Sequence, residues 1–164
     1  MRPVPLTPGP GQESVWDYPR PPRLAPVTER LRVILGGETI ADTVSGFRVL
    51  ETSHPPTYYI PPGDVAAGVL GPARLAGICE WKGRAVLFDV RAGGRTAPGA
   101  AWAYPDPTPG FTPIAGYLAF YAGPMEACFV GDVRAEPQPG GFYGGWITPA
   151  SSGPFKGGPG TMGW

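Results

Sequence analysis

Glycine and proline interrupt this chain so often that it must fold in short segments. The 164 residues include 26 glycines and 24 prolines, a share that on its own is typical of low-complexity chains. The distribution is uneven, because residues 1–26 contain 10 of them and residues 137–164 contain 14. Hydrophobic residues make up 42% of the chain and aromatic residues 12%. We therefore expect a globular body flanked by two Gly/Pro-rich arms.

The body is predicted to consist mainly of short strands. Residues 31–35 (LRVIL) alternate between two faces, and the Gly-Gly pair that follows predicts a hairpin into residues 38–43. A second Gly-Gly pair should turn the strand at residues 84–90 toward RTAPGAAWAY. Further strands are expected at residues 47–51, 57–60, 117–123 and 125–132, the last two as a closing hairpin around Gly123-Pro124.

Helical content is expected to be low. Residues 63–70 predict a short helix after two prolines, with Asp64 near its N-terminus. The stretch PDPTPGFTPIAGYL has four prolines in its first nine residues, so it predicts a loop with at most one helical turn. At least six strands with frequent turns predict a mainly β, single domain curled into a small barrel or sandwich.

The arms are expected to be ordered, because disordered tails are poor in aromatic residues. We place a Pro-rich arm at residues 1–26, the β-rich core domain at 27–136 and a Gly/aromatic-rich arm at 137–164. The arms should dock on the body or on a second subunit, which would make a homodimer. Their aromatic residues are Trp16, Tyr18, Phe142, Tyr143, Trp146, Phe155 and Trp164.

Charge and hydropathy narrow the class of partner. The net charge is zero and the lysines and arginines are scattered, so the sequence predicts no nucleic-acid partner. No apolar run approaches the length of a membrane span, and the N-terminus lacks the apolar core of a signal peptide. We expect a cytoplasmic protein, in which Cys79 and Cys128 are free thiols.

Four sequence blocks carry a family resemblance. HPPTYYIPPGDV, CEWKGRAVLFDV, AAWAYPDPTP and YLAFYAG are together similar to the bacterial domain of unknown function family 427, over roughly residues 30–135. The long arms resemble those of extended, actinobacterial-type members. The resemblance implies a β-barrel or β-tent-like fold, and a nucleotidyltransferase label is attached to some members.

The residues offer little support for that label. A nucleotidyltransferase needs a Gly-Gly or Gly-Ser turn followed by two carboxylates alternating on one strand, which hold two metal ions. Gly36-Gly37 is followed by Glu38 and Asp42 within a probable hairpin, with no D-x-D or D-x-E strand after it. Two distant cysteines and one histidine also fall short of a zinc site. We predict no metal and no cofactor.

His54 is the only histidine and lies in a Pro-braced loop, TSHPPTYY. An ordinary pKa near neutrality makes it a candidate catalytic base or ligand contact. The alternative is a hydrogen-bonded loop histidine without a functional role. Ser53 does not form a triad with it, because neighbours in an extended segment point to opposite sides.

The block CEWKG supplies the second group of candidates. Lys82 would hold an anionic group or a carbonyl, Trp81 would form a stacking wall and Glu80 would act as an acid or base. The alternative is an exposed lysine over an aromatic ring in a turn that Gly83 fixes.

Aromatic residues complete the predicted site. Trp102 and Tyr104 stand at i and i+2, so they share one face if the segment is extended. Tyr58 and Tyr59 alternate, so one belongs to the core, and we include Tyr58 among the ligand-binding residues. Core packing is the alternative explanation for all of them.

Three functions remain open from the sequence. The first is a small-molecule-binding domain with an aromatic-lined cleft. In this reading His54, Lys82 and Trp102 converge from distant segments at one end of the barrel, and we expect His54 and Lys82 to lie within about 10 Å of each other. The sequence does not decide whether such a cleft is catalytic. The second is a non-catalytic structural or self-association module whose arms exchange between subunits. The third is the nucleotidyltransferase of the family label.

Overall fold

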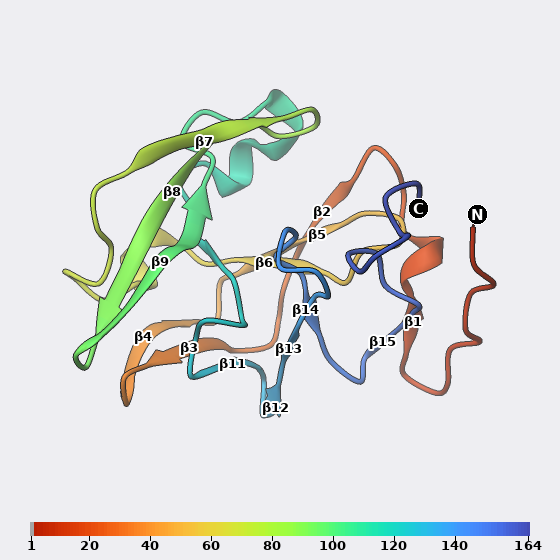
Figure 1. Ribbon diagram of the computed structural model, residues 1–164, viewed down its shortest axis with the longest axis horizontal. Coiled ribbons are helices and arrows are strands. Elements are labelled where there is room, and N and C mark those ends of the chain that lie inside the picture. Colours follow the sequence, from red (N-terminus) through yellow and green to blue (C-terminus); the bar gives the residue numbers. More distant parts are fainter. Residues whose placement is uncertain (1) are drawn as a thin grey trace.

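A computed structural model describes residues 2–164 and shows five small sheets joined by turns and three short 3₁₀ helices (Figure 1). The mainly β prediction is confirmed. The 3₁₀ helices are η1 (Val15–Asp17), η2 (Pro62–Asp64) and η3 (Pro109–Ile114).

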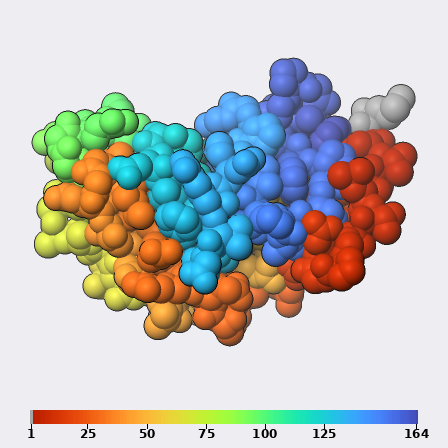
Figure 2. Space-filling model, turned by 90° about the horizontal axis from the view of Figure 1, so that it is seen from below, coloured from red at the N-terminus to blue at the C-terminus, as the bar shows by residue number. Residues whose placement is uncertain are grey.

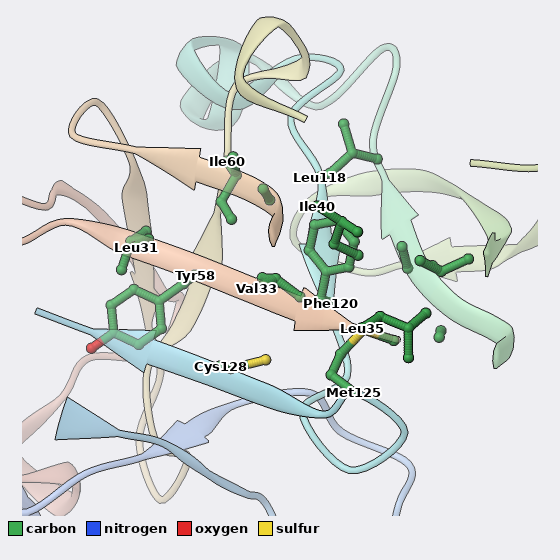
Figure 3. Close-up of a cluster of buried hydrophobic side chains, with 14 of the residues drawn as sticks. Leu31, Val33, Leu35, Ile40, Tyr58, Ile60, Leu118, Phe120, Met125 and Cys128 are labelled. Carbon is green, nitrogen blue, oxygen red and sulfur yellow. The ribbon is translucent and has the colours of Figure 1, made fainter. Parts of the chain in front are cut away.

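The first four-stranded sheet contains the predicted hairpin of residues 31–35 and 38–43. Its strand order is β12 (Val133–Arg134), β11 (Ala127–Val130), β3 (Leu31–Leu35) and β4 (Glu38–Thr43), all antiparallel. The predicted alternation along β3 is also confirmed, since Leu31, Val33 and Leu35 point together into the core (Figure 3).

The other sheets complete the body and attach the arms. A second four-stranded antiparallel sheet has the order β10 (Ala119–Phe120), β9 (Arg95–Ala103), β8 (Gly83–Ala92) and β7 (Arg74–Cys79). A third has the order β2 (Arg23–Pro26), β5 (Phe47–Leu50) and β6 (Thr57–Tyr59). Two strand pairs belong to the arms: β1 (Glu13–Ser14) with β15 (Ser151–Ser152), and β13 (Glu136–Pro137) with β14 (Trp146–Ile147).

Three details of the predicted fold are corrected. The predicted closing hairpin is wrong: β10 pairs with β9 whereas β11 pairs with β3, so Gly123-Pro124 leads from one sheet to another. The predicted helix at 63–70 is wrong, and only the 3₁₀ turn η2 is present there. The residues after it are extended, because Val65 forms an isolated β-bridge with Ala41 and Leu70 forms one with Val90. The strands of the described residues form separate open sheets in place of a closed barrel.

Two hairpin turns meet where the four-stranded sheets come together. Gly36 and Gly93 both have positive φ, 59° and 54°, and a Cβ atom on either would collide with backbone atoms of the other turn. Only glycine allows this backbone-to-backbone contact. The Glu38 carboxylate strengthens it by accepting a hydrogen bond from the Gly93 N–H at 3.1 Å.

The buried side chains form two main clusters. The larger, here called the main core, is mostly aliphatic and gathers around β3, β4 and β11 (Figure 3). The smaller, here called the cavity cluster, is mostly aromatic and contains Tyr59, Trp102, Tyr104 and Phe111. Strands between them contribute to both: along β9, Ala101 and Ala103 face the main core and Trp102 faces the cavity cluster, as does Tyr104 directly after the strand.

The arms pack on the body of the same chain. Both ends of the chain lie on the side opposite β7, β8 and β9 (Figure 1), and the C-terminal segment runs between the N-terminal segment and the body (Figure 2). Trp146 is 1% exposed and donates a hydrogen bond from Nε1 to the Phe120 carbonyl at 2.8 Å. Trp16 is 8% exposed, and its ring lies 5.7 Å from that of Trp164. Within residues 2–164, no helix has the length and apolar character of a membrane span.

Candidate functional site

A cavity of about 550 Å³ lies beside the cavity cluster. Five parts of the chain enclose it: the segment from β5 to β6, the β7–β8 hairpin, the end of β9 with Tyr104, the residue Tyr121 after β10, and the C-terminal arm around Tyr143. Six of the residues singled out from the sequence line it together: His54, Glu80, Trp81, Lys82, Trp102 and Tyr104.

Tyr58 is absent from the lining of this cavity, and Tyr59 takes its place. Tyr58 is buried in the main core, with its ring 5.2 Å from that of Trp146. The alternation of the pair along β6 was visible in the sequence. Which of the two faces meets the cavity depends on how the third sheet packs, and the sequence does not contain that information.

The aromatic wall of the cavity is a connected set of rings. Trp102 lies 4.6 Å from Tyr121 and 6.5 Å from Tyr59, measured between ring centroids, and Tyr59 lies 6.4 Å from Tyr104. Burial raises the pKa of Tyr59 and of Tyr104 well above the usual range, so both phenols stay neutral at physiological pH. The wall is therefore uncharged and rigidly packed.

The tip of the β7–β8 hairpin carries Glu80, Trp81 and Lys82. It is fixed to the loop after Tyr104: the Thr108 hydroxyl donates to the Trp81 carbonyl at 2.6 Å, and the Thr108 N–H donates to the Lys82 carbonyl at 3.1 Å. Both hydrogen bonds hold the tip of the hairpin, which lines the cavity, against the proline-rich loop after Tyr104.

The Lys82 amine lies 5.6 Å from the centroid of the Tyr104 ring, a cation–π distance. Among the described residues, no carboxylate lies within 4.0 Å of this amine. Lys82 is half-buried, so it offers the cavity a positive charge without a close counter-ion in the protein.

His54 is buried, 8% exposed, and its ring is held on two sides. Its Nδ1 lies 3.0 Å from the Gln138 side-chain nitrogen, and its ring packs edge-on against Tyr143 at 4.6 Å. On the other nitrogen, Nε2 lies 3.6 Å from the Glu51 carboxylate, which also pairs with Arg20 at 3.3 Å.

The surroundings lower the pKa of His54 to about 4. Burial is the largest cause, followed by the positive charges of Lys156, Arg20 and Lys82. The nearby Glu51 carboxylate favours the protonated ring, but Arg20 shares it, and burial together with the three cations outweighs it. His54 is therefore neutral at physiological pH.

The C-terminal arm closes one side of the cavity. Gly144 lies directly against the Trp102 indole, where a Cβ atom would collide with the ring. Phe142 and Tyr143 flank it, and the Phe142 carbonyl accepts a hydrogen bond from the Tyr121 hydroxyl at 3.0 Å. The FYGGW run (142–146) marks these residues as an aromatic docking segment in the sequence, but not as part of a cavity.

A family model described as a domain of unknown function (DUF427), with the short name NTP_transf_9, matches residues 23–131. The match covers more than half of the chain, so the protein belongs to this family. No curated protein sequence matches the chain at a significant level. The matched segment includes β2 to β11 and ends before Gln138, Tyr143 and Gly144, which complete the site from outside it.

The acidic residues after the first Gly-Gly turn are engaged away from the cavity. Glu38 binds the Gly93 N–H, and Asp42 forms a two-pronged ion pair with Arg30 at 2.6 and 2.7 Å. Within residues 2–164 there is no group of three or more His, Cys, Asp or Glu side chains suited to hold a metal ion.

Proposed function

We propose that this chain is a small-molecule-binding domain whose cavity takes a planar, aromatic ligand. The observation that carries the proposal is the convergence of aromatic side chains from five segments of the chain on one cavity of about 550 Å³. Pockets for small ligands typically have volumes of roughly 300–1,000 Å³ and a mainly apolar lining with a few polar groups.

Preorganisation supports the same function. The walls are held by hydrogen bonds from Thr108 and Tyr121 and by ring contacts among Tyr59, Trp102 and Tyr121. A ligand that enters such a cavity does not have to order its walls, so less binding energy is lost on association. Flat aromatic ligands gain most, because offset and edge-on ring contacts add to the burial of apolar area.

Binding of 2-naphthoate, compared with its saturated analogue decahydro-2-naphthoate, tests the proposal. Both carry the same charge, so a preference for the aromatic compound reports on the ring contacts. We expect 2-naphthoate to quench tryptophan fluorescence and to bind at least tenfold more tightly by calorimetry, which corresponds to about 1.4 kcal/mol. Equal binding of the two, or no binding of either, contradicts the proposal.

Two variants locate the binding. Trp81→Leu removes a half-buried ring from the hairpin tip and should weaken 2-naphthoate binding about tenfold, the loss expected for one stacking contact. Phe155→Leu is the matched control, because Phe155 packs with Trp16 and Trp164 in a third cluster and does not line this cavity. It should leave the dissociation constant unchanged.

A further inference from the structure

Gln138 has its side-chain amide oriented by two backbone groups. Its Oε1 accepts a hydrogen bond from the Gly145 N–H at 3.0 Å, and its Nε2 donates to the Lys156 carbonyl at 2.8 Å. An N–H cannot accept and a carbonyl oxygen cannot donate, so the amide cannot be flipped without breaking both bonds. The Nε2 group is thereby fixed as the donor toward His54.

The second N–H of that amide faces Nδ1 of His54 at 3.0 Å. Nδ1 must accept this hydrogen bond, so it carries no proton. A neutral imidazole has one N–H, which therefore stands on Nε2. The nearest carboxylate oxygen, from Glu51, is 3.6 Å away, beyond the usual range of a hydrogen bond. The Nε2–H donor of His54 is thus left for a ligand.

We propose that Gln138 is a positioning residue that holds His54 as an Nε2–H donor, and that the cavity selects aromatic ligands bearing an anionic oxygen such as a carboxylate. The ligand part of this inference rests on the proposed function; the tautomer part does not. The donor would bind the anionic oxygen, and the rings would cover the aromatic face.

The charges around His54 favour an anion. Glu51 shares its negative charge with Arg20 at 3.3 Å, whereas the positive charges of Lys156 and Lys82 both act on the imidazole. The cavity lining contains two carboxylates, Glu51 and Glu80, and Glu80 is exposed at the hairpin tip. Burial is the largest cause of the lowered pKa of His54, and the positive charges of Lys156, Arg20 and Lys82 lower it further.

The C-terminal arm, which lies outside the residues matched by the family model, thereby gains a role at His54. Gln138 lies between β13 and β14, beyond the matched residues 23–131. Its two backbone partners, Gly145 and Lys156, also belong to the arm. The arm therefore determines which nitrogen of a histidine in the matched segment carries the proton.

Nitrogen-15 NMR of the histidine ring tests the tautomer directly, because His54 is the only histidine in the chain. At pH 7 we expect an unprotonated Nδ1 and a protonated Nε2. A protonated Nδ1 in the wild-type protein overturns the assignment, and this result needs no variant.

Gln138→Glu sharpens the test. The new carboxylate has no N–H to donate, so Nδ1 of His54 should become protonated in this variant. Gln12→Glu adds the same charge in the N-terminal arm, where Gln12 contacts Gly9 and Pro149. It should leave the His54 spectrum unchanged. Retention of the wild-type spectrum in a folded Gln138→Glu protein would show that Gln138 does not position the ring.

The ligand class is tested with 2-naphthoate against 2-naphthylmethylamine, which have the same rings and opposite charge. We expect the wild-type protein to bind the carboxylate at least tenfold more tightly than the amine. His54→Leu should weaken the binding of 2-naphthoate about tenfold. His54→Gln should recover part of this affinity, because glutamine again offers an N–H. Equal affinities for the two probes overturn the inference while the proposed function stands. Binding of neither probe overturns both.

Discussion

The main core and the cavity cluster share strands β6, β9 and β10 but differ in what they contain. The main core is filled mostly by aliphatic side chains and alanines. The cavity cluster contains tyrosines and tryptophans and leaves about 550 Å³ open beside them. The first region contributes stability through its buried apolar area, and the second leaves an open volume that the proposed ligand would fill.

The C-terminal arm reaches both regions. Trp146 enters the main core, whereas Tyr143 and Gly144 line the cavity two or three residues earlier. Substitutions in the arm can thus separate what each region contributes.

The largest effect is expected from Trp146→Ala. The indole is 1% exposed and hydrogen-bonded to Phe120, so its removal should lower the free energy of unfolding by about 3–5 kcal/mol, as for other buried aromatic residues. Phe142→Ala, in the same arm but 75% exposed, should change it by less than about 0.5 kcal/mol. Urea unfolding measures both, and size-exclusion chromatography reports any change in oligomeric state. Similar values for the two variants would mean that Trp146 does not anchor the arm.

A pH-dependent effect of intermediate size is expected at His54. Its pKa is about 4 in the folded protein and about 6.5 in an unfolded chain. Between these values the unfolded state binds a proton that the folded state does not. Stability should therefore fall as the pH falls from about 6.5 to about 4, by up to about 3 kcal/mol from this group.

His54→Gln isolates that contribution, because glutamine does not titrate. The difference in unfolding free energy between pH 7 and pH 4.5 should be smaller in this variant than in the wild-type protein. Carboxylates with a lowered pKa, such as those of Glu13 and Asp89, titrate in both proteins and cancel in the comparison. Equal pH dependence would show that His54 is not buried in its neutral form.

Among the variants that are not controls, Gly144→Ala is expected to change stability least. The added methyl group would meet the Trp102 ring, so the arm must shift, at a cost of about 1–3 kcal/mol. The same shift alters the cavity wall and should weaken binding of 2-naphthoate. Gly63→Ala is a matched control, since apart from its chain neighbours no atom lies within 4 Å of the position that its methyl group would take. If Gly144→Ala binds the probe as well as the control does, the arm is not part of the cavity.

Local patterns in the sequence predicted much of the fold. The Gly-Gly pairs at 36–37 and 93–94 mark two hairpins that the structure contains. Alternation along residues 31–35 predicts the buried face of β3, and the i, i+2 spacing of Trp102 and Tyr104 predicts that both belong to the same cluster. These features depend on turn chemistry and on the two-residue period of a strand, both of which are local.

Errors arose where pairing between distant segments decides the outcome. Residues 119–120 and 127–130 look like a hairpin locally, but their partners are β9 and β3. β7 was not predicted as a strand, because its residues are largely exposed and show no clear alternation.

By itself, the sequence determined a mainly β chain with ordered arms, its family and the aromatic segments from which a site could be built. Only the tertiary structure decided that Tyr59, and not Tyr58, faces the cavity, and that Gln138 from the arm contacts His54 84 residues away. The reason is physical. The two-residue period of a strand places neighbouring side chains on opposite faces, but which face lies against the core and which against the cavity depends on how the sheets pack. A hydrogen bond between residues so far apart leaves no periodic trace in the sequence.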